Sequence, residues 1–334
     1  MSVGQAVPLF RIVDASLESA VRSAQRHSGR EGNVMKYVLR KPVLGEVPEI
    51  EISEESYKAY KESREILSNC LAIEEKYEIL ISNYIDLEEQ ILSATTSHVV
   101  REHLDYSDFF DVRLALNIRL VNLLTSARLY VDQLPQHVEK CVPHLGAAES
   151  RVKSLLAAEY DGNPQYRFME ALRNYVQHHG IPVHWTSLGA ERTGLGDDGL
   201  LEYSTELAAE KSFLEEDGEF KKQILGEISD KVDLKAATRC YIESLSSVHN
   251  AVRELIQESV QNSRLRLEDA HRQYQEVCEG SLVGLSACMA SDRRLIETVP
   301  LLLDWDDVRV KLQKRNRKLT NLRRRYVTGK IKKA

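Results

Sequence analysis

The strongest constraint on the fold is the helical spacing of apolar side chains from Ser53 to about residue 96. Tyrosine, leucine and isoleucine recur there every three or four residues, which places them on one face of a helix. Ser53 suits the N-cap of this helix, because Glu54 and Glu55 add negative charge to its first turn. The stretch predicts one very long helix, or two helices with a bend at residues 68–70.

Helical spacing continues in the next two stretches. It covers residues 108–134, where we expect Pro135 to end the helix, and residues 137–159, with a break at Pro143. Pro164 follows an Asp-Gly-Asn turn and suits the first turn of another helix. Three or four helices with such short connections are typical of a bundle.

Two regions predict β-structure. Residues 35–44 combine β-type side chains with flanking Pro and Gly, which indicates a strand. Residues 183–193 and 200–210 flank the turn-rich sequence GLGDDG and predict a β-hairpin. The early strand is a candidate third strand of the hairpin sheet.

The last third of the chain has helical spacing over residues 218–229 and a long helix over residues 234–278. After Gly280 we expect helix up to the end of the chain. The sequence therefore predicts a mainly α fold, with a helical bundle, a small β-hairpin or sheet and a long-helix C-terminal region. The expected parts are an N-terminal arm and strand (1–52), the bundle (53–182), the hairpin with a connecting helix (183–233), and long helices with a basic tail (234–334).

Composition excludes several classes of protein. The five cysteines among the 334 residues are widely spaced, with no C-x-x-C pair, so the sequence indicates neither a disulfide framework nor a zinc site. No H-E-x-x-H motif or phosphate-binding loop occurs, and we expect no metal and no cofactor. No signal peptide and no apolar run of roughly 20 residues is present, which favours a cytoplasmic protein without a membrane span.

The net charge of −6 conceals a strong asymmetry. Residues 308–334 hold twelve Lys or Arg residues and no Asp or Glu. Such a tail can bind the phosphates of nucleic acid, or it can fold back on the acidic remainder of its own chain. The sequence leaves both alternatives open.

The segment Tyr166–His179, YRFMEALRNYVQHH, carries the most chemistry. On a helix, Arg173, Asn174 and His178 fall on the polar side, opposite an apolar stripe that includes His179. Arg173 lies about 140° around the axis from His178, but its side chain is long enough to bend toward the same patch. A permanent cation and an imidazole that titrates near neutrality can together bind one phosphate.

This segment resembles the arginine–histidine signature of the HEPN superfamily (higher eukaryotes and prokaryotes nucleotide-binding). The match is Arg173-Asn174-x-x-x-His178, followed by GIPVH, and the resemblance covers roughly residues 53–185. It implies a helical bundle that cleaves RNA without metal, in a bacterial toxin or phage-defence setting. It also implies a homodimer in which two signature helices face each other, and an antitoxin or regulatory protein as a further partner.

Under this resemblance Arg173 stabilises the charge of the transition state, Asn174 orients His178 or holds a phosphate oxygen, and His178 is the acid or base. The expected RNA contacts lie at the start and end of the same helix and in the basic tail: Tyr166, Arg167, Gln177, His184, Arg323, Arg324 and Arg325.

Each of these assignments has a structural alternative. Arg173 and His178 can cap or salt-bridge a bundle helix beside Glu170, and Tyr166 can simply pack in the bundle. His179 is expected in the core or in an interface. The polar residues Asn122 and Ser126 can support the signature helix or hydrogen-bond between helices, which is the stronger expectation. The alternative function is therefore a non-catalytic helical interaction or scaffold protein.

Overall fold

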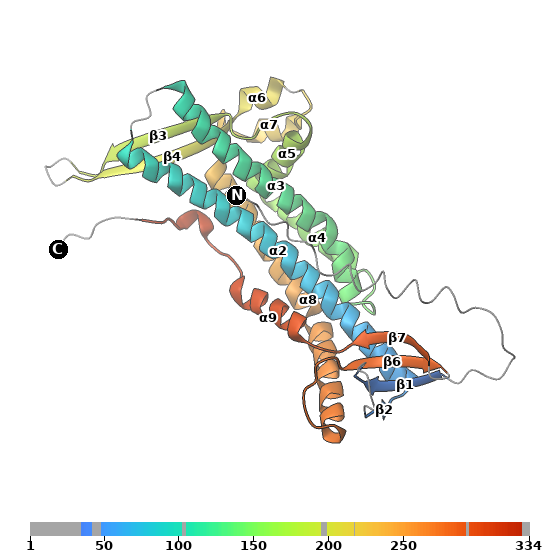
Figure 1. Ribbon diagram of the computed structural model, residues 1–334. Helices are drawn as coiled ribbons and strands as arrows, with labels where there is room; N and C mark the ends of the chain where they lie inside the picture. Colours follow the sequence, from blue (N-terminus) through green and yellow to red (C-terminus); the bar gives the residue numbers. More distant parts are fainter. Residues whose placement is uncertain are drawn as a thin grey trace, which may run out of the picture.

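The structure is a computed structural model that describes residues 35–41, 48–101, 105–194, 199–216, 218–291 and 294–328. Three long helices form a rod: α2 (Glu54–Val100), α3 (Tyr106–Cys141) and α8 (Leu234–Val277). They lie side by side along the rod, and a small antiparallel sheet lies at each end of it (Figure 1). The rise of a helix makes α2 about 70 Å long.

The stretch after Ser53 forms one continuous helix, which settles the choice between one helix and two. Ser53 is the N-cap, and its hydroxyl accepts a hydrogen bond of 3.0 Å from the backbone N–H of Ser56. Leu67, Cys70 and Leu80 are fully buried on the face that the sequence spacing indicated. Burial of this face, not local propensity, holds so long a helix together.

The prediction that Pro135 ends a helix is wrong. α3 continues through Pro135 to Cys141, and the next helix is α4 (Ala148–Gly162). Leu134 and Val138 are buried on either side of the proline in the same apolar face. This packing compensates for the backbone hydrogen bond that proline cannot donate.

The signature helix is α5 (Pro164–His178), and it begins as the sequence predicts. Pro164 occupies the first turn, and the side-chain oxygen of Asn163 accepts hydrogen bonds from the backbone N–H groups of Gln165 at 3.1 Å and Tyr166 at 3.3 Å. The amide nitrogen of Asn163 also donates to Ser244 of α8 at 3.0 Å. One side chain thus caps α5 and attaches it to the rod.

The sheet beside α5 contains the predicted hairpin. β3 (Trp185–Arg192) pairs antiparallel with β4 (Leu201–Glu210), and β4 pairs with β5 (Lys231–Asp233). Two short helices, α6 (Lys211–Glu216) and α7 (Lys222–Glu227), lie between β4 and β5 along the chain. The sequence predicted α7 but not α6.

The sheet at the opposite end has the strand order β2-β1-β6-β7. It consists of β1 (Met35–Arg40), β2 (Ile50–Glu51), β6 (Ser286–Ser291) and β7 (Arg294–Pro300). The early strand therefore pairs with β6, far along the chain, and not with the hairpin. The expected arm over residues 1–33 lies outside the described residues.

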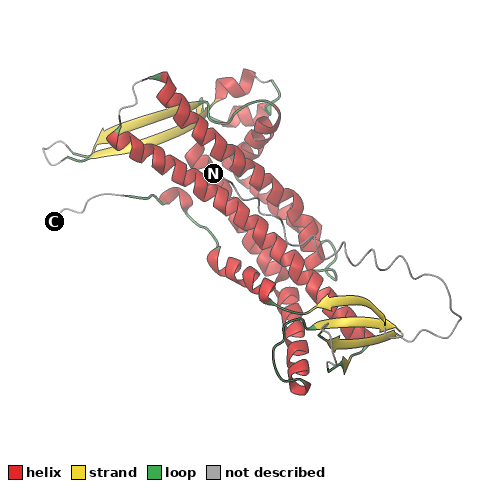
Figure 2. Cartoon of the chain, viewed as in Figure 1, coloured by secondary structure: helices red, strands yellow, loops and turns green. Residues whose placement is uncertain are grey.

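The expectation of helix from Gly280 to the end of the chain is wrong. β6 and β7 come first, then α9 (Asp304–Arg315), an extended stretch and the short 3₁₀ helix η1 (Leu322–Arg324). Figure 2 shows both sheets against a mainly helical chain. One continuous hydrophobic core extends from Leu39 to Leu322, so the four expected parts share that core.

Candidate functional site

Arg173 lies inside the protein, not on the polar surface that the sequence suggested. Its side chain is 5% exposed, and its Nη1 atom lies 3.0 Å from Oε2 of Glu170. The angles at Nη1 do not suit a hydrogen bond, so this contact is an ion pair. The Nη2 atom donates to the side-chain oxygen of Asn174 at 3.3 Å.

Glu170 joins this pair to the rod. Its Oε1 atom accepts a hydrogen bond of 2.5 Å from the hydroxyl of Tyr241 on α8. Burial, with the nearby Glu170 carboxylate, raises the pKa of Tyr241 far above its ordinary value, so the hydroxyl keeps its proton. A polar chain therefore runs from Tyr241 through Glu170 and Arg173 to Asn174 at the surface.

His178 lies apart from the Arg173 guanidinium, at the exposed end of α5. It lines a small hollow of about 150 Å³. The residues around this hollow are Ala171, Asn174, Tyr175, His178, His179, Glu219, Phe220 and Lys221. Arg173 reaches the hollow only through its hydrogen bond to Asn174.

His179 is exposed, so the expectation that it lies in the core is wrong, and the alternative that it lies in an interface stays a prediction. The helix ends at His178, and the backbone of His179 leaves the helical conformation with φ −132° and ψ −54°. The side chain therefore leaves the apolar stripe of α5. Its ring lies near that of Tyr175, with 6.1 Å between the ring centroids.

Gly180 allows the chain to turn tightly after α5. A Cβ atom at this position would overlap the hydroxyl oxygen of Tyr175. The ring of Tyr175 thus covers the turn, and a larger residue at position 180 would displace that ring.

Asn117 of α3 holds the next part of the same turn. Its side-chain oxygen accepts from the backbone N–H of Val183 at 2.9 Å, and its amide donates to the carbonyl of Val183 at 3.2 Å. Asn117 thus supports the turn after α5, whereas support of Arg173 or His178 was the lesser of two expectations for Asn122 and Ser126. Ser126 instead donates to the carbonyl of Leu123 within its own helix.

Two of the expected RNA contacts are used in packing. Tyr166 is 2% exposed, and its ring lies 5.1 Å from that of Tyr241. The guanidinium of Arg167 pairs with Glu227 and donates to the carbonyls of Tyr160 and Asp161, both at 2.7 Å. Arg167 therefore hydrogen-bonds the last carbonyl groups of α4, and its guanidinium is not available to a phosphate.

His184 is half-buried and carries no positive charge near neutral pH. Burial lowers the pKa of its imidazole below the ordinary value. Its Nδ1 atom accepts a hydrogen bond of 3.0 Å from the backbone N–H of Glu210, and its ring stacks on Phe213. Of the two contacts expected at the end of α5 and just beyond it, Gln177 is exposed and His184 is not.

Much of the basic tail docks on the protein itself. Arg309 is buried against Asp306, with a hydrogen bond of 2.8 Å to Oδ2, and Arg315 pairs with Glu78 of α2. The carbonyl of Arg325 accepts a hydrogen bond of 2.7 Å from Arg239. The described part of the tail thus matches the alternative in which it folds back.

The side chains of Arg323, Arg324 and Arg325 remain exposed on η1 and just after it. Arg323 lies 3.5 Å from the side-chain oxygen of Gln165. These side chains lie at the α5 end of α8, but they do not line the hollow beside His178.

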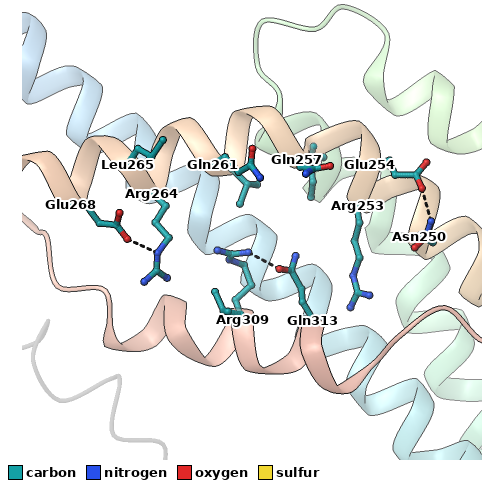
Figure 3. A pocket seen from close by; sticks show the side chains of 13 residues that line it. Asn250, Arg253, Glu254, Gln257, Gln261, Arg264, Leu265, Glu268, Arg309 and Gln313 are labelled. Atoms are coloured by element: carbon teal, nitrogen blue, oxygen red, sulfur yellow. Dashed lines mark hydrogen bonds and ion pairs between the residues drawn. The ribbon is translucent and has the colours of Figure 1, made fainter.

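A larger groove of about 700 Å³ lies between α8 and α9 (Figure 3). Arg253, Arg264 and Arg309 line it, together with the amide side chains of Gln257, Gln261, Gln313 and Asn250. Each guanidinium is engaged with acidic side chains: Arg264, for example, donates to Asp306 at 2.6 Å. The groove therefore offers little net positive charge to an anion.

A buried polar network in the centre of the rod escaped sequence reasoning. Glu74 of α2 accepts hydrogen bonds from Arg253 at 2.8 and 2.5 Å and lies 3.3 Å from Nε2 of His249. The hydroxyl of Tyr130 lies 2.9 Å from Nδ1 of His249, and the ring of Tyr77 stacks on the imidazole at 3.7 Å. The network joins α2, α3 and α8.

The protonation of this network follows from its contacts. Burial alone would raise the pKa of the Glu74 carboxyl, but hydrogen bonds from Arg253 and His249 outweigh it and hold that pKa at about 2. Burial lowers the pKa of His249. A neutral imidazole that donates from Nε2 to Glu74 and accepts at Nδ1 from Tyr130 satisfies every partner. The signal in the sequence was Glu74 itself, a carboxylate within an apolar stripe.

Apolar side chains also lie on the outside of the rod. We call Phe110, Leu114, Ile118, Val121, Thr125 and Leu129 the outer face of α3. Ile118 is 50% exposed, and Phe110, Leu114 and Leu129 are only slightly less so. A row of apolar side chains in water is typical of a surface that binds another protein.

Comparison with known protein families, with curated proteins and with solved structures gives no match to this chain. The HEPN resemblance therefore rests on the sequence signature and stays a prediction. Within the described ranges, no group of three His, Cys, Asp or Glu side chains is arranged to hold a metal ion. In the same part of the chain, no helix is both long and apolar enough to cross a bilayer.

Proposed function

We propose that this chain is a helical interaction protein, which works by binding other proteins along its rod. The observation that carries the proposal is the burial of Arg173 and its ion pair with Glu170. A guanidinium that stabilises a reacting phosphate must present its donors to that phosphate. The guanidinium of Arg173 instead forms an ion pair with Glu170 and donates one hydrogen bond to Asn174. Arg173 thus acts as a structural residue of α5.

The outer face of α3 is a second observation that supports this proposal. Its exposed apolar side chains have no role in the core of a single chain, and water makes their exposure unfavourable. The buried network of Glu74, His249 and Arg253 joins α2 to α8 and so stabilises the rod that presents this face.

Thermal and urea unfolding of two variants tests this role of Arg173. Arg173→Ala leaves Glu170, whose side chain is 16% exposed, without its cation, and should lower the free energy of unfolding by about 2 kcal/mol. His178→Ala should change it by less than about 0.5 kcal/mol, because His178 is exposed. Gln177→Ala, also exposed on α5, is the matched control. An Arg173→Ala protein that unfolds like wild type would contradict the structural role.

The second candidate is an RNA-binding or RNA-cleaving protein, as the HEPN resemblance implies. The observation that favours it is the hollow, which His178, His179, Asn174 and Lys221 line; the Lys221 ammonium donates to the hydroxyl of Tyr160 at 3.1 Å and would have to turn from it to meet a phosphate. Imidazoles there can exchange protons with a substrate, and the ammonium can attract a phosphate. A toxin or phage-defence role and a cytoplasmic location belong to this candidate. Loss of RNA cleavage in His178→Ala, with Gln177→Ala active, would favour it.

A further inference from the structure

The groove between α8 and α9 has an apolar floor (Figure 3). Ile256 and Val260 of α8 are buried in this floor, and Val310 of α9 is half-buried beside them. The residues that line the groove extend along α8 from Asn250 to Glu268, a distance of about 27 Å. A groove of that length fits the apolar face of a helix of about five turns.

The sequence that precedes β1 contains a segment with such a face. Placed at about 100° per residue, the apolar side chains of residues 9–24 share a stripe about 120° wide. These side chains are Leu9, Phe10, Val13, Leu17, Ala20, Val21 and Ala24. As a helix, the segment would be roughly 22 Å long, which the groove accommodates. Residues 9–24 lie outside the described residues.

We propose that residues 9–24 form an amphipathic helix that binds in the groove between α8 and α9 of the same chain. The position of β1 supports this occupant. β1 begins at Met35, in the sheet at the end of the rod where α8 ends, and the hydroxyl of Tyr274 donates to the carbonyl of Pro48 there at 3.2 Å. Residues 25–34 can extend over roughly 35 Å. The segment therefore enters the groove from the Glu268 end and lies parallel to α8.

Attachment to the same chain lowers the affinity that this contact needs. A connection of about ten residues gives the segment an effective concentration on the order of millimolar at the groove. A free peptide with a dissociation constant of about 50 µM would then correspond to a tethered segment that is bound in about 95% of molecules. The apolar stripe alone can supply such an affinity.

The geometry of α8 shows which edge of the segment faces α9. Arg253 and Arg264 each lie three positions before a buried residue, Ile256 and Leu267, and therefore about 60° further around the axis. Both guanidiniums donate to α9 or to its C-cap. A helix that is parallel to α8 and faces the same core therefore has α9 on the corresponding side of its stripe.

The side chains on that edge of the segment are acidic. Asp14 and Glu18 follow Val21 around the helix within about 60°. On α9, Lys311 and Lys314 are exposed. Because α9 is antiparallel to α8 and to the segment, Asp14 lies toward Lys314 and Glu18 toward Lys311. Opposite charges at these positions favour the contact.

Protection of an engineered thiol in the full chain provides the test. The five native cysteines are buried, so Val310→Cys adds a thiol that a maleimide reaches when the groove is uncovered. Leu17→Asp places a carboxylate in the apolar stripe and should raise the reaction rate of this thiol about tenfold. Ala15→Asp, on the polar side of the segment, is the matched control and should stay within about twofold. Val308→Cys lies on α9 outside the groove, where Val308 is 47% exposed, and should react equally in each case.

A charge exchange tests the direction of the segment. Asp14→Lys should raise the reaction rate of the Val310→Cys thiol about twofold to fivefold, and Lys314→Asp in addition should restore most of the protection. Circular dichroism confirms that each variant is folded. Equal rates with Leu17→Asp and Ala15→Asp overturn the proposal, and protection that is lost on dilution overturns it in favour of the segment of a second copy. Failure of the double variant to recover overturns the direction.

This inference goes beyond the proposed function and does not rest on it. The thiol reaction reports only whether residues 9–24 cover the groove, and RNA cleavage that requires His178 would overturn the proposed function without changing that result.

Discussion

The buried carboxylate of Glu74 should be a major source of the stability of the rod. The side chain is 1% exposed and accepts two hydrogen bonds from Arg253 and one from His249. Glu74→Gln keeps the size of the side chain but removes its charge. The amide oxygen can still accept one hydrogen bond from Arg253, but the guanidinium loses its charged partner and one acceptor, and it keeps the carbonyl of Asn316 at 2.6 Å.

Two independent estimates agree on the free energy of unfolding that Glu74→Gln should remove. The contacts hold the pKa of Glu74 at about 2, against an ordinary value of 4.5, and that difference corresponds to about 3 kcal/mol. Removing one partner of a buried ion pair costs about 3–5 kcal/mol, and the partial exposure of Arg253 places this pair at the lower end.

The pH dependence has a definite sign. The pKa of Glu74 is lower in the folded than in the unfolded chain, so its contribution is complete above about pH 4.5 and is lost as pH falls toward 2. Urea unfolding should therefore separate wild type from Glu74→Gln by about 3 kcal/mol at pH 7 and by about half as much at pH 3. A difference below about 1 kcal/mol at pH 7, or one that does not shrink in acid, would refute this reasoning.

Two local variants test how α5 is held. Asn163→Ala removes the cap of α5 and the bond to Ser244, and thermal unfolding should show a loss of about 1–2 kcal/mol, whereas an unchanged midpoint would exclude the capping role. Gly180→Ala places a methyl group against the Tyr175 ring and should cost about 1–3 kcal/mol and shift the NMR signals of that ring; a wild-type spectrum would show that the turn has room.

The helices were predictable because their signals are local. Ser53, Asn163 and the apolar stripe of α2 each act within a few residues, and the hairpin of β3 and β4 has its turn between its strands. The pairing of β1 with β6 joins positions about 250 residues apart, and nothing in the local spacing indicates it. The prediction that Pro135 ends a helix failed for the same reason, because the packing of Leu134 and Val138 is a tertiary effect.

At the candidate site, helical spacing did not indicate which polar residues the other helices bury. Spacing along α5 places Arg173 on the side away from the apolar stripe, but α8 brings Tyr241 to Glu170 on that side and so buries Arg173. His179 lies outside the apolar stripe because α5 ends at His178, one residue before the end of the helical spacing in the sequence. The partners of Glu74, His249 and Arg253, lie on α8 more than 170 positions further along the chain, so a carboxylate in an apolar stripe was the one sign of the network in the local sequence.

The central claim, that this chain binds proteins and does not cleave RNA through Arg173 and His178, is tested most directly by single-turnover cleavage. Labelled single-stranded RNA is mixed with excess wild-type protein, and the cleavage rate is compared with those of His178→Ala and Gln177→Ala. The account predicts no cleavage above background in all three samples. Cleavage by wild type and Gln177→Ala that falls by two or more orders of magnitude, roughly the effect of removing an acid or base, in His178→Ala would contradict it.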